Sequence, residues 1–151
     1  MCPKSLLIIG SCLILGLAPS RADDSRRPPT PLRAIATTDS TEVHPENVFE
    51  VTLALENPSD VAQKIKIPAC GWDRVWRSGN RRVTWDFWDC DADDEITIEI
   101  RPHERYVFPK QLKMFVDSSV KKSRVAFRMG FKTATFSKTL WSDPITLEVI
   151  P

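Results

Sequence analysis

Alternation of apolar and polar residues constrains the fold of this chain more than any other feature of the sequence. In residues 48–56 the apolar positions on one face are Phe49, Val51, Leu53 and Leu55. A period of two indicates a half-buried β-strand, because successive side chains of a strand point to opposite faces of the sheet. Residues 57–60, Asn-Pro-Ser-Asp, end this strand, and alternation resumes in residues 61–67. We expect these consecutive strands to form an antiparallel pair.

The same pattern recurs to the end of the chain. It is present in residues 95–100, 106–108, 125–131 and 145–149, and helical spacing is scarcely visible. Short strands at intervals of about 8 to 15 residues, with proline-marked turns, predict an all-β fold. The architecture we expect is an antiparallel β-sandwich of about seven strands. The pattern alone fits a small barrel equally well.

The N-terminal residues have the layout of a secretory signal peptide. Lys4 precedes an apolar run at residues 6–18, and the small residues Ser20 and Ala22 occupy the positions that a signal peptidase inspects. The apolar run is shorter than a membrane span of roughly 20 residues. We therefore expect residues 1–22 to be a signal peptide and the mature protein to be exported, either to the periplasm or outside the cell.

The same apolar run contains an alternative processing site. Residues 9–12, Ile-Gly-Ser-Cys, resemble the bacterial lipobox, in which the cysteine carries the lipid. The residues after Cys12 stay apolar, whereas a lipoprotein turns polar soon after its cysteine, and this favours simple secretion. Lipidation at Cys12 is the one route by which we expect the protein to be anchored to a membrane.

The rest of the chain divides into a lead-in and one domain. Residues 23–31 are charged and rich in proline, which predicts a flexible lead-in, and residues 32–151 have the length of one domain. Without Lys4 and Arg21, the mature chain has 19 basic and 20 acidic residues, a net charge of about −1. This balance gives no support to nucleic-acid binding, which requires a strongly basic surface.

Residues 70–90 hold four of the five tryptophans, and they begin and end with the only cysteines beyond the leader. In an oxidising compartment we expect a disulfide between Cys70 and Cys90. The residues Ser-Gly-Asn at 78–80 favour a turn midway between the cysteines. The segment therefore predicts a tryptophan-rich hairpin with the disulfide near its base.

Tryptophan occurs on both faces of this predicted hairpin, which one core-facing side does not explain. One interpretation is that at least one ring is exposed as a platform for a sugar ring or a partner protein. The alternative, which we favour, is that the rings pack around the disulfide and cover the end of the sandwich. The candidate binding surface consists of Trp72, Trp76, Arg77, Arg81, Arg82 and Trp88.

Motifs for catalysis or metal binding are lacking in the sequence. His44 and His103 each adjoin a proline, and no nucleophile motif or glycine-rich phosphate loop occurs. Carboxylates near Cys90 suit calcium, but they lack EF-hand spacing, and a solvated loop paired with the arginines explains them better. These carboxylates are Asp86, Asp89, Asp91, Asp93, Asp94 and Glu95. We expect a protein that is not an enzyme, with no catalytic residue, metal or cofactor.

The C-terminal segment carries a resemblance to a known family. Residues 141–149, Trp-Ser-Asp-Pro followed by an alternating strand, resemble the last strand of fibronectin type III and related immunoglobulin-like domains. Residues 125–131 match the penultimate strand, although the tyrosine common near the start of that strand is absent. The resemblance implies that residues 32–151 form an immunoglobulin-like β-sandwich of an exported bacterial protein.

Three functions are compatible with this sequence. The first is a binding module for a protein or carbohydrate, with recognition by the tryptophan- and arginine-rich hairpin and by sandwich loops. The second is a secreted proteinase inhibitor. Residues 75–78 and 100–104 resemble bacterial inhibitors of immunoglobulin-like type, although His103 stands where their Pro-Gly-Glu turn has glycine. The third is a structural envelope protein whose edge strands pair with a partner.

Overall fold

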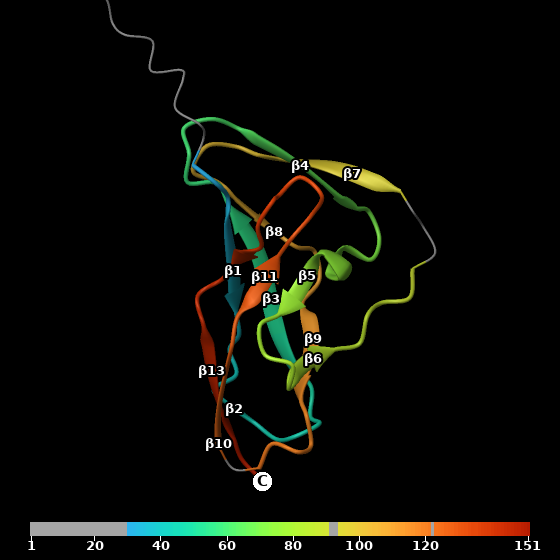
Figure 1. Cartoon of the computed structure of the whole chain (residues 1–151), viewed down its shortest axis with the longest axis vertical. Helices are drawn as coiled ribbons and strands as arrows, with labels where there is room; N and C mark the ends of the chain where they lie inside the picture. The colour runs from blue at the N-terminus through green and yellow to red at the C-terminus, as the bar shows by residue number, and fades with distance from the viewer. Residues whose placement is uncertain (1–29, 91–93, 122) are drawn as a thin grey trace, which may run out of the picture.

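The computed structural model describes residues 30–90, 94–121 and 123–151 (Figure 1). The predicted signal peptide at 1–22 with Cys12, and nearly all of the predicted lead-in at 23–31, lie outside the described residues, as do Asp91 and Asp93. Within the described part, the regular elements are strands and one short 3-10 helix, so the all-β prediction is confirmed.

The first layer is a five-stranded antiparallel sheet built around β3. Strand β1 pairs with one edge of β3. Strands β8 and β9 pair with different parts of the other edge, and β6 pairs with β9. The bounds are β1 Arg33–Thr37, β3 Phe49–Glu56, β6 Val83–Trp85, β8 Arg105–Val107 and β9 Leu112–Val116. The apolar face predicted for residues 48–56 is confirmed, because its four alternating apolar residues are buried in β3.

The second layer consists of two three-stranded sheets, with strand orders β10-β13-β2 and β12-β11-β5. Only Arg128 separates β10 from β11, and residues 142–144 separate β12 from β13. The predicted strand at 125–131 is therefore present but interrupted. The bounds are β2 Glu42–Val43, β5 Trp76–Ser78, β10 Ser123–Phe127, β11 Met129–Phe131, β12 Leu140–Trp141 and β13 Ile145–Val149.

A separate two-stranded sheet extends from one end of the molecule (Figure 1). It pairs β4 Gln63–Pro68 with β7 Glu95–Ile100, so the predicted pairing of residues 48–56 with 61–67 is wrong. Both edges of β3 are already occupied. In addition, the buried side-chain amide of Asn57 donates hydrogen bonds to the carbonyls of Ile100 at 2.9 Å and Arg101 at 3.1 Å. These bonds hold the turn after β3 beside β7.

The predicted hairpin over residues 70–90 is also wrong, although its turn is present. The first arm is the 3-10 helix η2 Trp72–Val75 followed by β5, which pairs with β11, whereas the second arm is β6, which pairs with β9. Trp76 and Trp85 are both buried. Because β5 belongs to the β12-β11-β5 sheet and β6 to the five-stranded sheet, the chain crosses from one layer to the other between β5 and β6.

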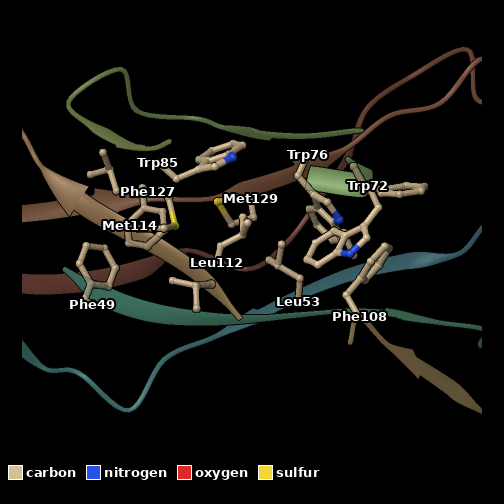
Figure 2. Packing of buried hydrophobic residues seen from close by; sticks show 14 of the residues in the cluster. Phe49, Leu53, Trp72, Trp76, Trp85, Phe108, Leu112, Met114, Phe127 and Met129 are labelled. Carbon is tan, nitrogen blue, oxygen red and sulfur yellow. The ribbon is translucent and has the colours of Figure 1, made fainter. Parts of the chain in front are cut away.

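Buried apolar side chains from both layers form one core cluster (Figure 2). Figure 2 shows Phe49, Met114 and Phe127 at one end of this core, and Trp72 and Phe108 at the other. Burying each such side chain contributes about 1.5–3 kcal/mol relative to leaving it exposed. A core between two strand layers is the arrangement of a β-sandwich.

Candidate functional site

The predicted disulfide between Cys70 and Cys90 is present, with the two Cα atoms 6.0 Å apart. It lies just beyond the β4–β7 ladder, where the N–H of Ala69 donates a hydrogen bond to the carbonyl of Asp94 at 2.7 Å. The bond therefore closes the loop that contains η2, β5 and β6. In the chain-entropy model a closed loop of about this length contributes roughly 3 kcal/mol.

Two of the predicted binding residues are buried. Trp72 is 4% exposed and Trp76 is 2% exposed, and both rings pack against Phe108, with ring centroids 4.7 Å and 5.4 Å from its centroid (Figure 2). Trp76 also meets Phe131 of β11, at 5.2 Å between centroids. These two indoles fill the core beneath the disulfide-closed loop, so their faces are not available to a ligand.

Trp88 is half-buried at the margin of the same cluster. Its ring meets the edge of Trp72 at 4.7 Å between centroids, and the Lys110 Nζ lies 5.2 Å from the Trp88 ring centroid. The N–H of Trp88 donates a hydrogen bond to Oδ2 of Asp73 at 3.1 Å. Asp73 is fully buried in η2, and sequence reasoning missed its role in holding the segment that returns to Cys90.

The three predicted binding arginines are exposed. Arg77 lies in β5, and Arg81 and Arg82 lie in the turn that follows it. Within the described residues, no ion pair joins any of them to a carboxylate, so the expected pairing with the acidic residues near Cys90 is not observed. Arg82 nevertheless lies close enough to Asp117 for its charge to contribute to lowering the pKa of that carboxyl.

The one strongly exposed tryptophan lies outside the disulfide-closed loop, among the described residues. Trp141 in β12 is 40% exposed, and its six-membered ring rests on Gly130 of β11. A Cβ at Gly130 would lie 2.6 Å from Cζ3 of Trp141, and a Cβ at Gly79 would lie 3.3 Å from the same atom. Two glycines on neighbouring segments therefore make room for this ring.

Basic side chains surround Trp141 on the outer surface of the β12-β11-β5 sheet. Gly130 pairs with Trp141 on one side and with Arg77 on the other, so the three residues share a face. Arg128 and Lys132 lie two residues either side of Gly130 and are exposed on that face. The Arg128 Cζ lies 5.4 Å from the Trp141 ring centroid. We call Arg77, Gly79, Arg128, Gly130, Lys132 and Trp141 the Trp141 face.

Two open hollows border the Trp141 face. One, of about 490 Å³, lies between β1 and β12 and is lined by residues 32–37 together with Thr139, Leu140, Trp141 and Asp143. The other, of about 350 Å³, is lined by Gly79, Ala126, Phe127, Arg128 and Pro144. Trp141 lines the first hollow and Arg128 the second, so the exposed ring is part of an extended, uneven surface.

Groups suited to catalysis or metal binding do not converge in the described part of the chain. His44 Nδ1 contacts the carbonyl of Pro151 at 3.0 Å, and His103 Nε2 contacts Oδ1 of Asp60 at 2.9 Å. The residues that the structure describes contain no cluster of His, Cys, Asp or Glu placed to hold a metal ion. None of their helical segments is long and apolar enough to cross a membrane. The Trp141 face therefore offers an aromatic ring and cations that have no carboxylate partner among the described residues.

Comparison with known proteins adds no relative: no family model, curated protein or solved structure matches this chain.

Three candidate residues were thus not predicted from the sequence: Trp141, Arg128 and Lys132. One sequence feature pointed to them. Gly130 interrupts the alternating strand at 125–131, and a glycine inside a strand marks a close approach of another group. The residues two positions either side of that glycine share its face, which would have selected Arg128 and Lys132.

Proposed function

We propose that this protein is an exported, non-enzymatic binding module of immunoglobulin-like fold, and that the Trp141 face is its recognition surface. The observation that carries the proposal is the exposed indole of Trp141, which rests on two glycines, has Arg128 over its ring and shares a face of the sheet with Arg77. Tryptophan and arginine are the residues that most often dominate binding energy at interfaces. A ring held by backbone also loses little side-chain entropy when a ligand binds.

The strand order supports an immunoglobulin-like fold. Constant-type domains have strands A, B, E and D in one sheet and G, F and C in the other. In chain order, the paths β1-β3-β9-β6 and β12-β11-β5 follow the same two sets. Trp76 on β5 then corresponds to the buried tryptophan of strand C, and it packs on Phe131 of the strand equivalent to F. The β4–β7 pair and the position of the disulfide are additions to that plan.

Export is supported by the leader-like N-terminus and by the Cys70–Cys90 disulfide, because disulfides persist in oxidising compartments. Intact mass of the protein recovered from its source tests this part of the proposal. We expect a chain that begins at Asp23 and gains two hydrogens on reduction. An acylated chain that begins at Cys12 would instead place the protein on a membrane, and two free thiols would contradict the oxidised state.

The binding proposal is tested by sedimentation with insoluble cell-envelope and extracellular material from the source organism. We expect the wild-type protein to sediment with this material and Trp141→Ala to lose most of the sedimenting fraction. The control is Val107→Ala, because Val107 is an apolar residue, 52% exposed, in β8 of the other layer. Equal sedimentation of wild type and Trp141→Ala would contradict the assignment of this face.

A second candidate, a secreted proteinase inhibitor, is favoured by one observation. His103 stands at the glycine position of the inhibitors' turn, and its φ of 58° is in the left-handed region that favours glycine. The turn is also held, because the N–H of His103 donates to the carbonyl of Asn57 at 2.9 Å. Titration into serine proteinases of broad specificity tests this candidate. Inhibition without cleavage of the protein would support it, and cleavage or lack of inhibition would exclude it for those enzymes.

A further inference from the structure

We propose that the Trp141 face binds an acidic polysaccharide, a chain of sugar rings that carries carboxylate or sulfate groups. This inference rests on the proposed function, since it names the ligand class of the same face. Three properties of the described residues support it: a fixed exposed ring, cations without a carboxylate partner, and a surface that extends beyond the ring into two hollows.

The first property is the packing of the Trp141 ring against glycine. Its six-membered ring packs against Gly130 and Gly79, while 40% of the residue stays exposed. A Cβ at Gly130 would lie 2.6 Å from this ring, so the close seat requires glycine. Aromatic rings offer a broad, weakly negative apolar face, and the C–H groups of a sugar ring are its complement. A fixed ring of this kind suits one sugar unit of a chain.

The second property is the charge around the ring. Arg77 is directly across Gly130 from Trp141, and the Arg128 guanidinium lies over the ring, with its Cζ 5.4 Å from the ring centroid. Within the described residues neither arginine, nor Lys132, has a carboxylate within ion-pair distance. The planar guanidinium group matches carboxylate and sulfate oxygens with two parallel hydrogen bonds. Because no carboxylate of the described residues neutralises these side chains, they can pair with acidic groups on the sugars next to the stacked one.

The third property is the extent of the surface. The hollow of about 490 Å³ lies on the β1 side of Trp141, and the hollow of about 350 Å³ lies on the side of Gly79 and Arg128. The first hollow is lined by six consecutive residues, 32–37, which include all of β1. In the described structure β1 pairs with β3 alone, so its outer backbone groups can bond sugar hydroxyls. A chain of several sugars fits this surface better than a single ring.

Asp143 provides a test of charge on this surface. It is exposed and lines the same hollow as Trp141, and no ion pair in the described structure involves it. A carboxylate here repels an acidic ligand without contributing to the stacked ring. Removing its charge should therefore strengthen binding of an acidic polysaccharide and leave binding of a neutral one unchanged.

The experiment uses the oxidised mature protein and isothermal titration calorimetry at low salt. The probes are polygalacturonate for carboxylate groups, dextran sulfate for sulfate groups, dextran as the neutral sugar, and polyglutamate as the acidic peptide. We expect micromolar to millimolar binding of at least one acidic polysaccharide, weakened by added salt, and none of dextran. Trp141→Ala should lower the affinity about tenfold or more, and Arg77→Ala with Arg128→Ala should do the same. Asp143→Asn should raise it a few-fold.

Matched controls separate the Trp141 face from general charge. Arg124→Ala removes an exposed arginine that pairs with Glu148, and Val107→Ala removes an exposed apolar side chain on β8 of the other layer. Both should bind as the wild type does. Trp141→Phe keeps a smaller ring, and it should retain part of the affinity if Trp141→Ala disturbs folding. Thermal unfolding of each variant establishes that the fold is intact.

Three results would overturn the inference: no binding of either acidic polysaccharide, binding that is indifferent to Trp141, or polyglutamate bound as tightly with the same dependence on Trp141. The sedimentation test distinguishes this failure from failure of the proposed function. If envelope material still requires Trp141 while both acidic polysaccharides fail, only the ligand class is wrong. If neither material requires Trp141, the recognition surface itself is wrong.

Discussion

The disulfide-closed loop and the Trp141 face use tryptophan in opposite ways. In the loop, Trp72 and Trp76 are 4% and 2% exposed, and their rings pack on Phe108. On the outer surface of the β12-β11-β5 sheet, Trp141 is 40% exposed and packs on glycine backbone. The loop therefore supplies stability, and the sheet surface supplies a fixed ring that faces solvent.

The difference shows that density of aromatic residues in the sequence does not locate a binding surface. A cluster of tryptophans between two cysteines is explained by the core that it fills, because a large ring contributes most to stability when it is buried. An exposed ring requires a different explanation. For Trp141, the glycines that make room for the ring and the cations on the same face point to ligand binding.

Truncation of a buried tryptophan should destabilise the protein far more than truncation of the exposed one. Trp76→Ala should lower the free energy of unfolding by about 3–5 kcal/mol, because it empties a fully packed core site. Trp141→Ala should lower it by about 1 kcal/mol or less, as expected for an exposed residue. Urea unfolding followed by circular dichroism measures both values. If the two substitutions lowered the free energy of unfolding equally, Trp76 and Trp141 would not differ as a core residue and a surface residue.

The disulfide gives the next largest effect. Replacing Cys70 and Cys90 by alanine should cost roughly 3 kcal/mol, since the unfolded chain regains the freedom of the closed loop. Trp141 and Arg128 lie outside that loop, and Arg77, which lies inside it, is held by the pairing of β5 with β11. The folded variant should therefore keep any Trp141-dependent binding. Unfolding curves with and without the bond give the first value, and sedimentation with envelope material gives the second. Loss of binding in a folded, disulfide-free variant would mean that the two regions are coupled.

A smaller effect is expected at the seat of Trp141. Gly130→Ala places a Cβ 2.6 Å from the ring and should cost about 1–3 kcal/mol by overpacking. In a Trp141→Ala background the cost should fall, leaving mainly the contact with Cγ2 of Thr139. A double-mutant cycle of unfolding free energies measures this coupling. Additive effects of the two substitutions would show that the ring does not rest on Gly130.

The smallest effect concerns Asp117. Hydrogen bonds from the side chain and the backbone N–H of Ser119 hold the pKa of this carboxyl below its usual 3.8, and the charge of Arg82 contributes. A lowered pKa in the folded state stabilises the protein above the unfolded pKa, and this stabilisation is lost as pH falls through the folded pKa. Asp117→Asn should therefore melt slightly below the wild type at neutral pH, and the gap should close in acid.

Thermal unfolding across the acid range measures this gap. A constant difference in melting temperature at every pH would contradict the lowered pKa. Arg77→Ala is the matched comparison, because Arg77 lacks an acidic partner in the described structure. Its effect on the melting temperature should stay the same across the acid range.

Part of the fold could be predicted from the sequence, because a strand with one buried face and one face in solvent has alternating apolar and polar residues. β3, β7 and β13 each bury one face and expose the other for much of their length, so period-two alternation identifies them. β2 and β12 have two residues each, which is too short for any pattern. Strand pairing was not predictable locally, since the partner of β4 depends on buried hydrogen bonds of Asn57 to residues 100–101.

The candidate site was predictable only in part for the same reason. Arg77 was selected because it lies near a conspicuous turn, but its neighbours Trp141 and Gly130 come from strands more than fifty residues later in the chain. Their approach to Arg77 is a property of β5 pairing with β11. The predicted hairpin paired β5 with β6, so it did not place Arg77 next to Gly130 of β11.

Acrylamide quenching of tryptophan fluorescence, compared between Trp141→Phe and the wild type, measures whether Trp141 is the tryptophan that solvent reaches. If Trp141 is the displayed indole and Trp72, Trp76 and Trp85 are core, the variant should lose most of the readily quenched fluorescence while its unfolding curve stays close to that of the wild type. Quenching that is unchanged in Trp141→Phe would mean that the accessible tryptophan lies between the cysteines, and the account of the two regions would be wrong.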